Sequence, residues 1–247
     1  MYQLNRIYNV DSYLAVKDFP DCSVDCIYID APYLYNKRGI SSKRRGVKMS
    51  SVYNEIKDIC DGFDYSIFDD FKRIMKKTNI FIWCSMLQVK DIIDYWMLIK
   101  DIKLQILFWK KTNAFPLNNS LVNDVEICLW FRSPGVKVNG NYHNKMHCFI
   151  GETNRKDKKE FGHPTIKPYE CVKNHIICGT NEGDLVVDFF SGSGTTAVVC
   201  KDIHRNFICF EKRKDYYENS LKRLNEIPVI SSNPGQLTLF DCCEDYV

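Results

Sequence analysis

The segment from Asp184 to Cys200, DLVVDFFSGSGTTAVVC, joins an apolar run, a glycine-rich turn and a second apolar stretch. Leu185 to Val187 is typical of a strand buried on both faces, and Asp188 closes it. Glycine lets the backbone approach a ligand, and the following helix N-terminus offers free N–H groups. The spacing in Gly192 to Ala197 also fits the dinucleotide fingerprint, with Glu211 as the ribose-binding acid. The segment predicts a ligand cradle; a tight turn without a ligand is the alternative.

A second strand end carries an unusual set of side chains. Residues 24–29 are strong β-formers and are followed by Asp30-Ala31-Pro32-Tyr33. In an open α/β sheet, ligands bind at the carboxyl ends of the strands. A carboxylate, a proline-stiffened turn and an aromatic ring would then lie where chemistry occurs. An ordinary strand-terminating turn is the alternative.

The composition limits the class of protein. A chain of 247 residues that is 45% apolar can form one large domain or two small ones with a sizeable core. The net charge of +3 does not by itself imply a nucleic-acid partner. With no secretory signal and no apolar run near the ~20 residues of a membrane span, the cysteines indicate reduced thiols in a cytoplasmic protein. No metal site is predicted, since His143, His147 and Cys148 lack a second ligand pair at a standard spacing.

The hydrophobic periodicities indicate alternating strands and helices. The expected strands are 7–10, 24–29, 80–83, 104–109, 125–131, 185–187 and 206–211. Helices are expected after 10, at 64–76, 87–99 and 168–178, after 194, and up to 226. The link between 104–109 and 125–131 is too short for a helical crossover, so this pair is predicted to be antiparallel. The predicted fold is α/β, with a mostly parallel seven-stranded sheet that has one antiparallel strand.

Three segments interrupt this alternation. Residues 37–48, KRGISSKRRGVK, contain six basic and no acidic side chains, which fits either a phosphate-binding loop or a solvated one. Residues 132–162 are rich in Gly, Asn, Lys and His and are predicted to be a surface insertion. The predicted organisation is a domain at 1–228, with a basic loop at 34–60, and a C-terminal tail at 229–247.

Together with the sequence HPTIKP at 163–168, the two strand ends resemble motifs of the amino-methylating DNA methyltransferases that use S-adenosylmethionine. More narrowly they resemble the circularly permuted β class, in which the catalytic tetrapeptide precedes the glycine motif. The resemblance covers residues 5–226 and includes FWKKTNAFP at 108–116 and FICFE at 207–211. Ala31 and Phe189 depart from it, because proline is usual at both positions. The resemblance implies a Rossmann-like S-adenosylmethionine methyltransferase fold.

The resemblance also implies how the cofactor is bound. The glycine turn would approach its methionine end, with the helix N-terminus at Thr195 favouring the carboxylate. Glu211 would accept from the ribose hydroxyls and Asp11 from the adenine amine, while Phe190 and Ile29 pack on apolar faces. The predicted cofactor-binding residues are Asp11, Ile29, Asp30, His163, Thr165, Lys167, Asp188, Phe190, Gly192, Ser193, Gly194, Thr195, Thr196 and Glu211.

The predicted catalytic residues are Asp30, Ala31, Pro32 and Tyr33. The exocyclic amine of a base is a poor nucleophile, since its lone pair is delocalised into the ring. Asp30 and the Ala31 carbonyl would accept its two N–H bonds and align the lone pair. Tyr33 would stack on a base flipped out of the duplex. Ala31 keeps the carbonyl but lacks the ring that fixes φ, and activity is expected to be retained.

Asp at position 30 favours adenine N6 as the target; cytosine N4 is the alternative, because the enzymes of that type more often carry Ser there. The resemblance implies that the insertion at 132–162, together with the loop at 34–60, recognises the target sequence. Two other classes explain less of the sequence. A nicotinamide-dependent oxidoreductase would use the glycine turn and Glu211, but the turn lies in the last quarter of the chain. A non-catalytic nucleic-acid-binding protein would explain the basic run but not the acids at the strand ends.

The predicted partner is double-stranded DNA in restriction-modification, with phosphate contacts from Lys37, Arg38, Lys43, Arg44, Arg45 and Lys48. In the tail, Gln236, Leu237, Leu239 and Phe240 match a Gln-Leu-x-Leu-Phe motif by which bacterial proteins bind the sliding clamp. Exposed apolar side chains in a polar tail indicate a binding surface, here for the clamp. The alternative is that the tail packs on the chain's own domain. A homodimer is a further expected partner, and a membrane is not.

Overall fold

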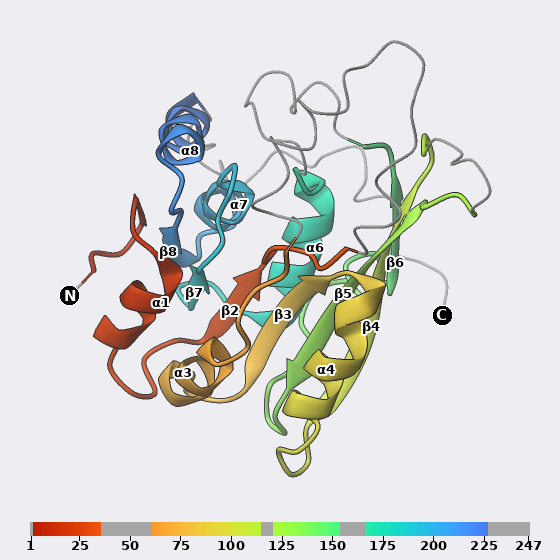
Figure 1. Cartoon of the computed structure of the whole chain (residues 1–247), viewed down its shortest axis with the longest axis horizontal. Coiled ribbons are helices and arrows are strands. Elements are labelled where there is room, and N and C mark those ends of the chain that lie inside the picture. The colour runs from red at the N-terminus through yellow and green to blue at the C-terminus, as the bar shows by residue number, and fades with distance from the viewer. Residues whose placement is uncertain (1, 36–60, 115–120, 154–165, 227–247) are drawn as a thin grey trace.

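The computed structural model describes residues 2–35, 61–114, 121–153 and 166–226. These residues form one sheet with helices on both faces (Figure 1). The strands of the sheet are β1 (Arg6–Tyr8), β2 (Cys26–Ile29), β3 (Asn79–Cys84), β4 (Lys103–Lys111), β5 (Val125–Arg132), β6 (Cys148–Gly151), β7 (Leu185–Asp188) and β8 (Asn206–Phe210). Their spatial order is β1-β8-β7-β2-β3-β5-β4-β6.

Only one of these strands, β5, runs against its neighbours. It pairs antiparallel with both β3 and β4, whereas the other neighbouring pairs are parallel. The predicted α/β fold and the predicted antiparallel pair are therefore confirmed. The short link between β4 and β5 explains this, because a parallel return needs a crossover of a dozen residues or more.

The sheet has eight strands where seven were predicted. The additional strand, β6, lies inside 132–162, which was predicted to be a surface insertion. It pairs in parallel with β4, and Phe149 packs against buried residues of the core. Its short apolar run, Cys148 to Ile150, is surrounded by polar residues, so the composition of the whole segment concealed it. The segment thus extends the sheet at one edge instead of lying wholly outside it.

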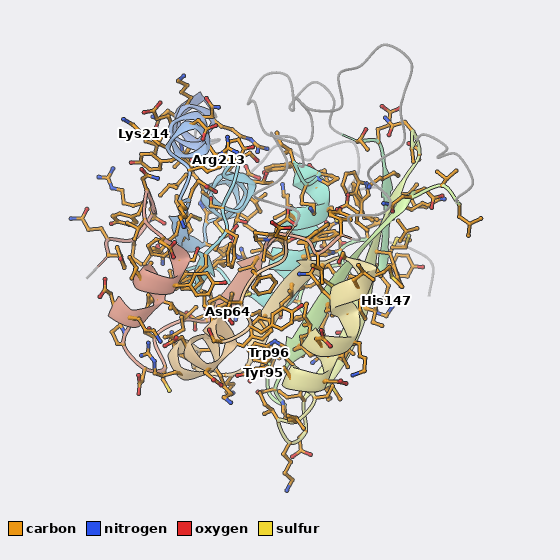
Figure 2. The ribbon with its side chains drawn as sticks, viewed as in Figure 1. Asp64, Tyr95, Trp96, His147, Arg213 and Lys214 are labelled. Carbon is orange, nitrogen blue, oxygen red and sulfur yellow. The ribbon has the colours of Figure 1, made fainter. Side chains whose placement is uncertain are left out.

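The helices of the described residues divide between the two faces of the sheet. They are α1 (Ser12–Ala15), the 3-10 turn η1 (Val16–Asp18), α3 (Ile67–Ile74), α4 (Met86–Trp96), α6 (Tyr169–Gly179), α7 (Thr195–Asp202) and α8 (Lys214–Glu226). Buried residues of α1, α3 and α4 share one core cluster, and those of α6 and α7 share another, against which α8 packs. Figure 2 marks Trp96, the last residue of α4, whose indole is buried in the first cluster.

Successive side chains of the central strands alternate between the two core clusters. On β2 and β3, Ile27, Ile29 and Ile80 point to the first cluster, while Tyr28 and Phe81 point to the second. Every residue of these two strands is buried, which explains why the sequence there is a continuous apolar run. Packing on both faces fixes the register of β2 and β3, and therefore fixes where each strand ends.

Several acidic residues lie together at one edge of the sheet. Strands β1, β8, β7, β2 and β3 are parallel, so their carboxyl ends meet at this edge. They are followed there by Asp11, Glu211 and Asp30, and β7 ends on Asp188. Because β5 runs in the opposite direction, its amino end arrives at the same edge: Cys84 pairs with Ile127, which places Glu126 just beyond β3.

None of the helices within the described ranges has the length and apolar composition that crossing a bilayer requires.

Gly179, at the end of α6, provides a test of this packing. An added Cβ would lie 2.7 Å from Phe81 Cε2. The Phe81 ring is fully buried and stacks on Trp130 and on His175, at centroid distances of 4.7 and 5.6 Å, so a shift of the ring would disturb both contacts. Gly179→Ala should lower the free energy of unfolding by about 1–3 kcal/mol, measured by urea denaturation. An unchanged unfolding midpoint would show that this layer is looser than the structure implies.

Candidate active site

A cavity of about 990 Å³ opens at this edge of the sheet and contains residues from both predicted sets. It extends from the ends of β1 and β8 to the start of β5. The predicted residues that line it are Asp11, Asp30, Ala31, Pro32, Tyr33, Lys167, Asp188, Phe190, Gly192, Ser193, Thr195, Thr196 and Glu211. The cavity therefore joins the predicted cofactor cradle to the predicted catalytic tetrapeptide.

Two predicted cofactor-binding residues lie behind the cavity wall. Ile29 is fully buried within the core of β2. Gly194 is the N-cap of α7 with φ of +75°, and a Cβ there would lie 2.9 Å from Ser220 Cβ of α8. Both positions are thus explained by packing. His163 and Thr165, the six basic residues at 37–48 and the four tail residues at 236–240 lie outside the described residues.

The glycine turn is tied to the next strand by Glu211. One Glu211 oxygen accepts from the backbone N–H of Gly192 at 2.8 Å, and the other accepts from that of Arg213 at 2.7 Å. Gly192 has φ of +51°, a conformation that favours glycine. Burial raises the pKa of Glu211, although the two N–H groups oppose this. Figure 2 marks Arg213, where β8 leads into α8.

Asp188, at the end of β7, lines the cavity and is almost fully buried. Its carboxylate accepts from Phe190 N–H at 2.9 Å and from the Thr196 hydroxyl at 2.5 Å. Burial nevertheless raises its pKa to about 7. A cation placed beside Asp188 would therefore favour its ionised form strongly.

Asp11 occupies the outer end of the cavity. It caps α1 by accepting from Tyr13 N–H at 2.9 Å and forms an ion pair with Lys212 at 2.9 Å. Burial tends to raise its pKa, but Lys212 and the capping N–H groups lower it overall. Asp11 is therefore an ionised acceptor in the lining of the cavity.

An aromatic wall near this end was missed by the sequence analysis. Phe63 lines the cavity and packs against Phe190, with ring centroids 5.7 Å apart. Tyr13 also lines it, and its hydroxyl accepts from Asp64 N–H at 2.8 Å. The sequence offers little signal for Phe63, because the surrounding Asp-Gly-Phe-Asp has the composition of a turn.

At the other end, Lys167 lies between two carboxylates. Its Nζ is 2.6 Å from Asp30 Oδ2 and 3.2 Å from Glu126 Oε2. The other Glu126 oxygen is 2.7 Å from Lys111 Nζ, and the Tyr33 hydroxyl donates to Glu126 at 3.3 Å. The sequence analysis placed Lys167 among the cofactor-binding residues. In the structure its ammonium contacts Asp30, which was in both predicted sets. Glu126 was not predicted to be a site residue, because it lies at the start of a strand and the sequence analysis looked for acids at the ends of strands.

The charges around Lys167 shift the pKa values of Asp30, Glu126 and Lys167 itself. Burial raises the pKa of Asp30, and the charge of Lys167 acts against that rise. The pKa of Glu126 is lowered to about 2, because Lys167 and Lys111 outweigh the effect of burial. The two carboxylates in turn raise the pKa of Lys167 despite its own burial. Lys167 is therefore a cation and Glu126 a carboxylate at neutral pH.

The tetrapeptide is also held from α4. Gln88 Nε2 donates to the Pro32 carbonyl at 3.1 Å, and the Ser85 hydroxyl donates to the Leu34 carbonyl at 2.8 Å. Ala31, which departs from the family pattern, is almost fully buried in the first core cluster. Phe189, the second departure, stacks on Phe71 and Phe210. Both departures are thus accommodated by the core.

Among the described residues, no three His, Cys, Asp or Glu side chains are grouped in a way that could hold a metal ion. The described cysteines are free thiols, most of them buried.

Asp188 should make the stability of the ligand-free protein depend on pH. Its pKa is about 7 in the folded state and 3.8 ordinarily, so its contribution to stability is complete below pH 3.8 and lost as the pH rises through 7. The free energy of unfolding should fall by about 2 kcal/mol between about pH 5.5 and pH 8, since one pKa unit is about 1.4 kcal/mol. In Asp188→Asn, urea denaturation should show this fall removed; an identical fall in both proteins would contradict the assignment.

Comparison with known proteins agrees with this geometry. A sequence model of a DNA methylase family, the N6/N4 methyltransferases, matches residues 24–222. The chain is 30% identical to the type II methyltransferase M2.DpnII of Streptococcus pneumoniae, over 82% of each chain. It is 28% identical to the type II methyltransferase M.HinfI of Haemophilus influenzae, over 96% of this chain and 72% of that protein. The crystal structure of the M1.HpyAVI–SAM complex superposes with a TM-score of 0.66 and 25% identity, over 89% of this chain and 99% of that one. The predicted resemblance is confirmed, and the chain belongs to the N6/N4 DNA methylase family.

Proposed function

We propose that the protein transfers a methyl group from S-adenosylmethionine to the N6 amine of adenine in double-stranded DNA. The observation that carries this proposal is the single cavity joining Asp30 and Tyr33 to the acids and glycine turn at the ends of β7 and β8. One end can accept an amine, and the other can hold a nucleoside with a charged tail. The similarity to the M1.HpyAVI–SAM complex supports the choice of cofactor.

The residues present fit this cofactor. Glu211 and Asp11 are acceptors suited to ribose hydroxyls and the adenine amine, and Phe63 and Phe190 give an apolar wall for a flat ring. Asp188 is a nearly buried carboxylate whose pKa of about 7 calls for a cation, such as the ammonium of the methionine end. When bound, S-adenosylmethionine supplies a methyl group activated by its positively charged sulfur.

The chemistry proposed for the chain is positioning. The Asp30 carboxylate and the Ala31 carbonyl accept the two N–H bonds of the amine, which directs its lone pair away from the ring and towards the methyl group. Tyr33 stacks on the base. A base inside the duplex cannot reach this cavity, so it is flipped out, at a cost of a few kcal/mol. The proton released by the methylated amine leaves through this acceptor pair or to water.

Adenine is favoured over cytosine because position 30 is an aspartate. The test is to incubate the protein with S-adenosylmethionine and DNA, digest the DNA and identify the modified nucleoside by mass spectrometry. N6-methyladenine is the expected product. N4-methylcytosine would correct the target base, and the absence of any methylated base would contradict the function.

Asp30→Ala should abolish methyl transfer. Its carboxylate lies at the catalytic end of the cavity, so cofactor affinity by calorimetry should stay within a few-fold. Asp94→Ala is a matched control, since Asp94 is exposed on α4 and pairs with Lys90. Loss of cofactor binding with normal residual turnover in Asp30→Ala would contradict its role.

We also propose that the tail binds the sliding clamp through Gln236, Leu237, Leu239 and Phe240; the support is the sequence match alone. Tethering to a clamp would raise the effective concentration of enzyme on DNA. A peptide of residues 232–245 should bind a bacterial clamp with micromolar affinity, measured by fluorescence anisotropy, and the double change Leu239→Ala, Phe240→Ala should remove binding. Deletion of 234–247 should leave methylation of short oligonucleotides intact; unfolding on deletion would instead assign the tail to the core. Phosphate contacts by the basic loop and a homodimer remain predictions.

A further inference from the structure

Lys167 is enclosed at the catalytic end of the cavity by groups of two kinds. Two carboxylates, Asp30 and Glu126, lie 2.6 and 3.2 Å from its Nζ. Two aromatic rings, those of Tyr33 and Trp83, each have their centroid 5.1 Å from the same atom. Only 5% of the Lys167 side chain is exposed, so this ammonium has exchanged most of its water for the protein. Of the two carboxylates, the nearer is Asp30, the residue to which the catalytic role is proposed.

Glu126 is the centre of the support behind Lys167. It lies at the start of β5, and its two oxygens face different cations: Lys167 on one side and Lys111, from β4, at 2.7 Å on the other. The same residue accepts from the Tyr33 hydroxyl at 3.3 Å. Asp30 and Tyr33 are the two ends of the catalytic tetrapeptide. Glu126 contacts Tyr33 directly, and it is linked to Asp30 by Lys167, which contacts both carboxylates.

The charges of this cluster balance. Asp30 and Glu126 are two anions, and Lys167 and Lys111 are two cations, arranged in alternating order. A buried charge is tolerated when an opposite charge and hydrogen bonds replace its water, and removal of one partner leaves the other uncompensated. Asp30 in a desolvated pocket without Lys167 would therefore tend to take up a proton. A protonated Asp30 is a poorer acceptor for the amine of a base.

We propose that Lys167 is a positioning residue that keeps Asp30 ionised and correctly oriented for the amine, and that Glu126 is the positioning residue that holds Lys167 and Tyr33 in place. The proposal rests on the function proposed above for Asp30. It assigns Lys167 to the catalytic end of the cavity instead of the cofactor cradle. It also gives a role to Glu126, which no motif of the sequence indicated.

Other titratable groups face Asp30 and are part of the same environment. They are Tyr28 of β2, Tyr33 of the tetrapeptide, Cys84 of β3, Cys128 and Glu126 of β5, and Asp188 of β7. Burial raises the pKa of both thiols and both phenols, so these four are neutral at physiological pH. Glu126 and Asp188 can only disfavour ionisation of Asp30. Lys167 is thus the cation in direct contact with Asp30 that opposes them.

The test uses the full chain, S-adenosylmethionine and an oligonucleotide substrate, with methylation followed under single-turnover conditions across pH. Lys167→Met should slow the methylation step about 100-fold and move its acidic limb upward by about one pH unit or more, while cofactor affinity changes less than about threefold. Lys167→Arg keeps a cation and should retain the acidic limb of the natural protein. An unchanged pH profile with cofactor affinity lowered in parallel would overturn the proposal and return Lys167 to the cradle.

The variant Glu126→Gln tests the proposed role of Glu126 in holding Lys167 and Tyr33. It should slow methylation without weakening cofactor binding, and Glu182→Gln, an exposed change in the link before β7, should do neither. Because Glu126 acts largely through Lys167, the double variant Lys167→Met, Glu126→Gln should be no slower than Lys167→Met alone. In Lys167→Met, Glu126 still contacts Lys111, and the double variant removes one of the two carboxylates that had faced Lys167, so it gives a second measurement if Lys167→Met folds poorly. Losses that multiply would overturn the role of Glu126.

The experiments distinguish a failure of the inference about Lys167 from a failure of the proposed function. If Asp30→Ala abolishes methylation while Lys167→Met keeps the rate and pH profile of the natural protein, the inference about Lys167 is wrong and the proposed function stands. If Asp30→Ala keeps its activity, the proposed role of Asp30 is wrong, and the inference about Lys167 fails with it.

Discussion

The structure depends on the need to compensate several carboxylates that one edge of a parallel sheet brings out of water. Parallel strands deliver Asp11, Asp30, Asp188 and Glu211 to this edge. Each is compensated in a different way. Asp11 pairs with a lysine and caps a helix, and Asp30 contacts a buried lysine. Asp188 accepts from a hydroxyl and a backbone N–H, and Glu211 accepts from two backbone N–H groups. The differences in compensation divide the cavity into regions with distinct chemistry.

The least compensated of these carboxylates is Asp188. It accepts hydrogen bonds from a hydroxyl and a backbone N–H, and burial still raises its pKa to about 7. Asp30 is the opposite case, because Lys167 contacts it directly at 2.6 Å. A site built in this way has one buried acid without a cationic partner among the described residues and another in direct contact with a lysine. That division suits a reaction between a cationic methyl donor and a neutral amine.

The departures at Ala31 and Phe189 show how packing can replace a family residue. Proline at either position would restrict φ. Here Ala31 is enclosed by the first core cluster, and Gln88 of α4 holds the next carbonyl. Phe189 gains two stacked aromatic neighbours. The backbone at both strand ends is therefore fixed by neighbours from distant parts of the chain.

The sequence by itself determined the α/β fold, the antiparallel pair and most of the cavity-lining residues, since these depend on local signals: apolar periodicity, glycine spacing and acids that follow a strand. It could not find β6, whose short apolar run lies in a polar segment, or Phe63, which lies in a turn-like stretch. It also could not find Glu126 or the contact that Lys167 makes with Asp30. Only the tertiary structure decided these, because β5 runs antiparallel and brings the start of a strand, instead of its end, to the catalytic edge.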